Sequence, residues 1–133
     1  MKSIVVGFID TPEGHAALET AMSEARLREA TLVVLHSMVG GTHEKDDEYL
    51  ASAEAIEAVH DQLSSSGIEH STHEYIRGNA PAKDLIDAVK VHDAGLIVIG
   101  IRKRSSTGKV LFGSNALDIL HDAPVPVLCV KAL

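Results

Sequence analysis

The chain has 133 residues, of which 45% are hydrophobic and 3% aromatic, with no tryptophan. This composition fits one globular domain over residues 1–133 and argues against a disordered chain. A net charge of −7 argues against nonspecific nucleic-acid binding, which needs a basic surface. With one cysteine, no signal peptide and no apolar run long enough to span a bilayer, we expect a cytoplasmic protein without intrachain disulfides or membrane contact.

The first part of the chain alternates short β-branched runs with segments whose apolar residues recur at helical spacing. Thr11 followed by Pro12 is typical of a helix start, since threonine caps and proline suits the first helical position. We therefore expect, in chain order, a strand over Ile4–Phe8, a helix over about Pro12–Glu29, a strand over Thr31–His36, a helix over about Asp46–Ser65 and a strand over Glu69–Ile76.

The second part continues the alternation around the most apolar strand of the chain. Pro81 suits a helix start, and Gly113 with Ser114 and Asn115 opens the last helix. The expected elements are a helix over about Ala82–His92, a strand over Gly95–Gly100, a connection over Ile101–Phe112, a helix from Gly113 through Leu120 and a strand over Val125–Val130.

Strands that alternate with helices in this way predict a three-layer, doubly wound α/β fold with a five-stranded parallel sheet. The third strand, Glu69–Ile76, is far more polar than the others, so we place it at an edge and infer the strand order 3-2-1-4-5. Ligands in such sheets bind beyond the carboxyl ends of the strands where the order reverses, between strands one and four. The loops 9–13 and 101–114 flank that point.

The last strand, Val125–Val130, lies at the other edge in this order and is apolar. An exposed apolar edge favours pairing with another chain, and Pro126 blocks pairing at one position only. We therefore expect a homodimer through this strand.

The segment from Gly100 to Asn115 concentrates positive charge in an otherwise acidic chain. Its basic residues are Arg102, Lys103, Arg104 and Lys109. The free amides of the helix that starts at Gly113 and Ser114 favour an anion, and a solvated loop with an ordinary cap is the alternative. A P-loop is excluded because it requires glycine at position 103 and serine or threonine at position 110.

Both ends of the chain resemble the universal stress protein family. The similar segments are Val6-Gly7 with Thr11-Pro12-Glu13, Gly78-Asn79-Ala80, and the tail from Gly113 through Ala123-Pro124 to Lys131. The resemblance covers essentially the whole chain and implies an adenine-nucleotide-hydrolase-like fold. Nucleotide-binding members carry Gly-x2-Gly-x9-Gly-Ser/Thr after strand four, which here corresponds to Gly100, Lys103 and Gly113-Ser114.

The resemblance implies a bound adenine nucleotide, ATP or AMP, with Mg²⁺ as a possible companion of the phosphates. The implied binding residues are Phe8, Ile9, Asp10, Ser37, Ile99, Gly100, Arg102, Lys103, Gly113, Ser114 and Asn115. The chain departs from the family pattern twice: Lys103 replaces the middle glycine, and Ile9 stands where binders usually have aspartate, with Asp10 one residue later. Lys103 either pairs with a phosphate or fills the space where one would pass.

No catalytic residue and no metal site are predicted, and any ATP hydrolysis should be slow and incidental. His70 and His73, three apart in a strand, should face opposite sides. His36 is either a satisfied core residue or a ligand contact, and Cys129 is expected to be a small buried hydrophobe. Besides nucleotide binding in a stress response, two functions stay open. One is a nucleotide-free dimeric stress module that acts through protein contacts. The other is an enzyme that uses Lys103 or Lys109 electrostatically on a phosphorylated small molecule.

Overall fold

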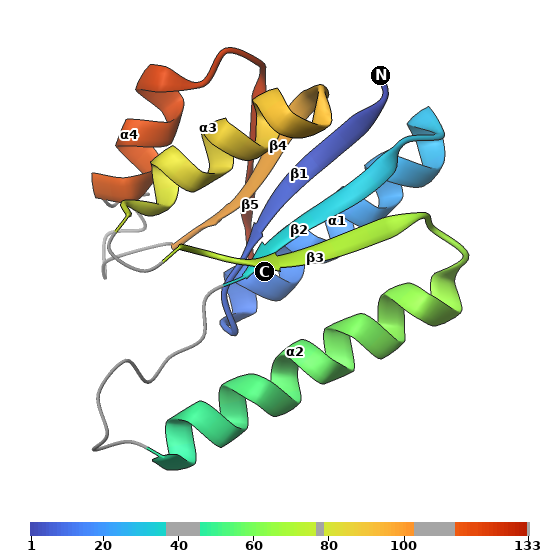
Figure 1. The fold of residues 1–133 in the computed structure, drawn as a ribbon, viewed down its shortest axis with the longest axis vertical. Helices are drawn as coiled ribbons and strands as arrows, with labels where there is room; N and C mark the ends of the chain where they lie inside the picture. Colours follow the sequence, from blue (N-terminus) through green and yellow to red (C-terminus); the bar gives the residue numbers. More distant parts are fainter. Residues whose placement is uncertain (37–45, 77–78, 103–113, 133) are drawn as a thin grey trace.

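A computed structural model of the protein describes residues 1–36, 46–76, 79–102 and 114–132, without the side chains of 46–52 and 114. Strands and helices alternate along the described chain (Figure 1). In order they are β1 (Ser3–Phe8), α1 (Pro12–Arg28), β2 (Thr31–His36), α2 (Asp46–Ser66), β3 (His70–Glu74), α3 (Pro81–His92), β4 (Ala94–Ile101), α4 (Ser114–Asp122) and β5 (Val127–Lys131).

The five strands form one parallel sheet in the order β3-β2-β1-β4-β5, which confirms the predicted fold class and strand order. Helices α1 and α2 contribute to the apolar core on one face of the sheet, and α3 and α4 to the core on the other (Figure 1). The order reverses between β1 and β4, so the loops that follow these two strands leave the sheet in opposite directions.

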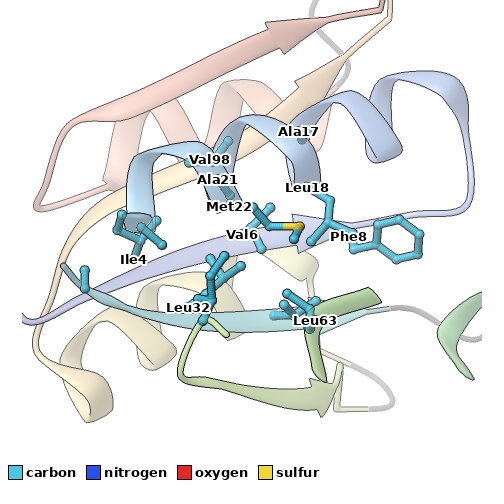
Figure 2. Packing of buried hydrophobic residues seen from close by; sticks show 14 of the residues in the cluster. Ile4, Val6, Phe8, Ala17, Leu18, Ala21, Met22, Leu32, Leu63 and Val98 are labelled. Carbon is cyan, nitrogen blue, oxygen red and sulfur yellow. The ribbon is translucent and has the colours of Figure 1, made fainter. Parts of the chain in front are cut away.

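The residues of β1 alternate between the two cores, as the period of a strand requires. Ile4, Val6 and Phe8 pack against α1, and the side chain of Phe8 is fully buried there (Figure 2). Val5 belongs to the opposite core, beneath α3. A run that is buried on both faces is typical of a central parallel strand.

Local signals fix both ends of α1 where the sequence predicts them. The Thr11 hydroxyl accepts a hydrogen bond from the Gly14 amide at 3.0 Å, and Pro12 stands at the first helical position. The helix ends at Glu29, which adopts a left-handed conformation with φ of 53° and donates its amide to carbonyls of the last turn.

Strand boundaries differ from the prediction by one or two residues. β4 continues through Ile101, so the turn after it begins later than expected. β5 begins at Val127 and not at Val125, because Pro126 has no amide to donate, although its carbonyl accepts from the Ile97 amide at 3.0 Å. None of the helices in the described part of the chain is long and apolar enough to cross a membrane.

Candidate functional site

A cavity of 560 Å³ lies at the point where the strand order reverses. It is bounded by the carboxyl ends of β1 and β4, the first turn of α1, the residue after β3, and the starts of α3 and α4. The described lining residues are Gly7, Ile9, Thr11, Glu13, Gly14, Tyr75, Pro81, Leu85, Ile99, Gly100, Ile101, Arg102, Asn115, Ala116 and Ile119.

Two glycines let the backbone segments around the cavity approach closely. A Cβ on Gly100 would lie 2.6 Å from the carbonyl carbon of Glu13, and one on Gly14 would lie 2.8 Å from the carbonyl carbon of Ile9. Backbone atoms cannot swing aside as a side chain can, so these positions accept only glycine without a shift of strand or helix. The end of β4 is thereby held against the N-terminus of α1.

Among the described lining residues, the charged side chains form one ion pair. Arg102 Nε, directly after β4, lies 3.4 Å from the Glu13 carboxylate in the first turn of α1. The Arg102 side chain is 61% exposed and that of Glu13 is 18% exposed, so the carboxylate is the more enclosed partner. An anion in the cavity would be attracted by Arg102 and repelled by Glu13, which also competes for Arg102.

A partly buried tyrosine, Tyr75, forms another part of the wall. A Cβ on Gly7 would meet the Tyr75 hydroxyl at 2.9 Å, so the phenol occupies the space above β1 that glycine leaves open. Burial, with the nearby Asp84 carboxylate, raises the pKa of Tyr75 far above its ordinary value, so the phenol stays protonated. Asp84 itself accepts hydrogen bonds from the Ile76 amide at 2.7 Å and the Asn79 side chain at 3.1 Å.

Five of the predicted site residues line the cavity: Ile9, Ile99, Gly100, Arg102 and Asn115. The side chain of Phe8, another predicted binding residue, does not line the cavity and is fully buried in the core on the α1 face. Phe8 and Ile9 alternate across the sheet, so only one of the two can face the cavity.

Asp10 is exposed and does not line the cavity. Its carboxylate lies 2.8 Å from His15 Nε2, in the first turns of α1. Ser37, Lys103 and Gly113 lie outside the described residues, as does the side chain of Ser114, which begins α4.

The contributions of α3 and of the end of β3 to this site were not predicted from the sequence, whereas the start of α1 follows the loop 9–13 that was expected to flank the strand-order reversal. Glu13 and Tyr75 supply the polar groups of these walls, and Leu85 and Ile119 supply apolar ones. Tyr75 follows a parallel strand directly, which was a usable signal. The preceding strand, β3, lies at the sheet edge, however, and the Tyr75 hydroxyl comes near β1 only because the side chain is long.

The histidine and cysteine predictions have clear outcomes. His70 packs on His60 of α2 and His73 on His92 of α3, so the two face opposite sides of the sheet as predicted. His36 is buried and does not line the cavity, and its Nδ1 has no hydrogen-bond partner among the described residues. Cys129 is half-buried, and desolvation raises the pKa of its thiol, which opposes nucleophilic reactivity.

Comparison with known proteins agrees with this fold. The profile of the Universal stress protein family matches residues 1–131. The chain belongs to the universal stress protein family. A Universal stress protein of Mycolicibacterium smegmatis is 37% identical over 128 residues, 96% of each chain. Universal stress protein Mb2346c of Mycobacterium bovis is 34% identical over 137 residues, and this chain spans 47% of its length.

Solved structures of universal stress proteins share the fold over nearly the whole chain. One from Archaeoglobus fulgidus is 39% identical with a TM-score of 0.76, covering 98% of this chain and 99% of that one. Another from the same organism, solved in complex with dAMP, is 34% identical with a TM-score of 0.71 and covers 98% of both chains. Among the described residues of the present universal stress protein, no group of three or more metal-ligating side chains occurs.

Proposed function

We propose that this universal stress protein binds an adenine nucleotide, AMP or ATP, in the cavity between the ends of β1 and β4. The observation that carries the proposal is the cavity's position at the strand-order reversal, with Gly100 and the start of α4 on its border. The complex of the A. fulgidus relative with dAMP supports an adenine nucleotide as the ligand. Such binding would serve a regulatory role in a stress response in the cytoplasm.

The cavity suits a nucleoside monophosphate in size and chemistry. Its volume of 560 Å³ lies within the range of about 300–1,000 Å³ usual for small-molecule sites. Ile9, Ile99 and Leu85 offer apolar surface to a base, and Arg102 offers a cation to a phosphate. We assign the phosphates to the side of Gly100, Arg102 and Asn115, together with Lys103, Gly113 and Ser114 from the adjoining loop. Mg²⁺ would arrive with the phosphates of ATP, as this ion usually does.

The role of Lys103 decides how strong the binding is. It replaces the glycine of the family pattern, so it either pairs with a phosphate or obstructs it. Calorimetry of AMP and ATP with the wild type and with Lys103→Gly separates these roles. Weaker binding in the variant means that the lysine holds a phosphate, and tighter binding means that it blocks one.

The same titration tests the proposal itself. We expect binding of AMP or ATP by the wild type and its loss in Gly113→Asp, which places a carboxylate at the start of α4 against the phosphates. No heat with the wild type at millimolar nucleotide would overturn the proposal. Binding that is unchanged in Gly113→Asp would move the phosphates away from this helix.

We propose further that the protein is a homodimer joined through β5. The apolar residues Val127, Leu128 and Val130 are only half-buried at this edge of the sheet, which supports pairing with a second chain. A dimer without nucleotide, acting through protein contacts, is the second candidate function, favoured by the loss of the family glycine at position 103. A native mass spectrum that shows only monomer would contradict both forms of the dimer.

A further inference from the structure

We infer that the Tyr75 hydroxyl is a hydrogen-bond donor to the nucleoside half of the ligand, and that Gly7 is the positioning residue that makes room for it. This inference rests on the proposed function, because it assigns a contact inside the same cavity. It adds a specificity-determining residue that the motif after strand four does not contain.

The first support is the reach of the side chain across the sheet. Tyr75 follows β3, whereas Gly7 is in β1, and β2 separates the two strands. Neighbouring strands are spaced by about 4.8 Å, so β1 and β3 lie roughly 10 Å apart. The hydroxyl nevertheless comes within 2.9 Å of the position that a Gly7 Cβ would take. The phenol therefore extends over β2 toward the strand-order reversal.

The second support is that the backbone of Tyr75 is held in place, whereas its hydroxyl bonds to no residue that the structure describes. The Tyr75 amide donates to the His36 carbonyl at 3.0 Å, and the Ile76 amide donates to Asp84 Oδ2 at 2.7 Å. These bonds tie the backbone on both sides of the ring to β2 and α3. Among the described residues, no hydrogen bond reaches the Tyr75 hydroxyl, although the residue lines the cavity.

The third support is the protonation state and the position along the cavity. The raised pKa of Tyr75 keeps the hydroxyl neutral and able to donate at any physiological pH. Tyr75 borders the cavity from the β1 and β2 side, whereas Arg102 and Asn115 border it from the β4 side. With phosphates at the β4 side, the nucleoside lies beside Tyr75, and a ring or ribose acceptor takes its proton.

Calorimetry of AMP, adenosine and inorganic phosphate with single and double variants tests this contact. Tyr75→Phe removes only the hydroxyl. We expect it to weaken the binding of AMP and of adenosine by the same factor, roughly 5- to 30-fold, and to leave the binding of phosphate unchanged. Gly7→Ala should weaken both by displacing the hydroxyl. In the Tyr75→Phe background, Gly7→Ala should not weaken binding further, because no hydroxyl is left to displace. A further loss of affinity there would mean that Gly7 has a purely structural role.

Gly95→Ala is the matched control, since its Cβ would meet the flexible Met1 side chain at 2.8 Å, away from the cavity. It should leave all three titrations unchanged, and melting temperatures check that each variant folds. If Tyr75→Phe bound AMP with wild-type affinity, the inference would be overturned and the proposed function would stand. The same holds if Tyr75→Phe bound AMP more weakly but adenosine with wild-type affinity. A wild type that binds neither AMP nor adenosine would overturn both.

Discussion

Replacing Gly100 by alanine should separate the two backbone segments that form the floor of the cavity. The new Cβ would lie 2.6 Å from the Glu13 carbonyl carbon and 3.1 Å from the Gly14 nitrogen. Both atoms belong to the first turn of α1, whose start is fixed by the Thr11 cap. The contact can be relieved only if the end of β4 or the start of α1 moves.

The expected loss of stability follows from comparison with Gly95, where the side chain that a new Cβ would contact can move. Overpacking against rigid structure costs about 1–3 kcal/mol, so the melting temperature of Gly100→Ala should fall by roughly 3–12 °C. Gly95→Ala meets the Met1 side chain at 2.8 Å, but Met1 is 51% exposed and can turn into solvent. We therefore expect Gly95→Ala to melt within about 2 °C of the wild type.

Thermal unfolding followed by circular dichroism compares the two variants, and calorimetry with AMP follows the cavity. Gly100→Ala should lose both stability and affinity, because α1 and β4 each supply residues to the wall. If Gly100→Ala were as stable as Gly95→Ala, the close approach of β4 to α1 would be refuted. If it lost stability but bound AMP normally, the cavity would not be the nucleotide site.

Glu13→Gln should tighten AMP binding severalfold, because it removes a negative charge from the cavity and frees Arg102 for the phosphate, and the gain should shrink at high salt in the same titration. Asp84→Ala should lower the free energy of unfolding in urea by about 1–3 kcal/mol, because it orphans the Ile76 amide, whereas Asp87→Ala on the exposed side of α3 should leave it unchanged. Burial lowers the pKa of His36 below 6.5, so the unfolded chain binds this proton more readily and wild-type stability should fall as the pH drops below 6.5. In urea unfolding between pH 7 and pH 5, the free energy of unfolding should fall less for His36→Leu than for the wild type. An equal fall would mean that His36 does not cause this pH dependence.

The order of elements was predictable because each signal was local and consistent with the next. The apolar run Thr31–His36 and the capping pair Thr11-Pro12 appear in the structure where the sequence places them. The polar third strand lies at the sheet edge as predicted, since a strand with one wet face cannot occupy the centre. Together these signals left one plausible sheet order.

The site was predicted only where it follows the strand ends. Gly100 and Arg102 come directly from β4 and line the cavity. Tyr75 was missed because it follows the edge strand β3, and only the fold brings its side chain to β1. Glu13 lies in the loop 9–13 that was expected to flank the site, but its carboxylate was not predicted as a site residue. The burial of the Phe8 side chain away from the cavity was not foreseen, because an apolar run does not show which of its residues face which core.

The location of the ligand is tested most directly by amide chemical shifts of the ¹⁵N-labelled protein titrated with AMP. We predict that the shifted amides are those around the cavity, with Gly7, Gly14, Gly100 and Asn115 among the largest. The hollow of 360 Å³ between the end of α1 and the end of α2, lined by residues such as Glu29 and Ser66, is the internal control and should not respond. Shifts confined to that hollow or to β5, or no shifts at all, would contradict nucleotide binding at the ends of β1 and β4.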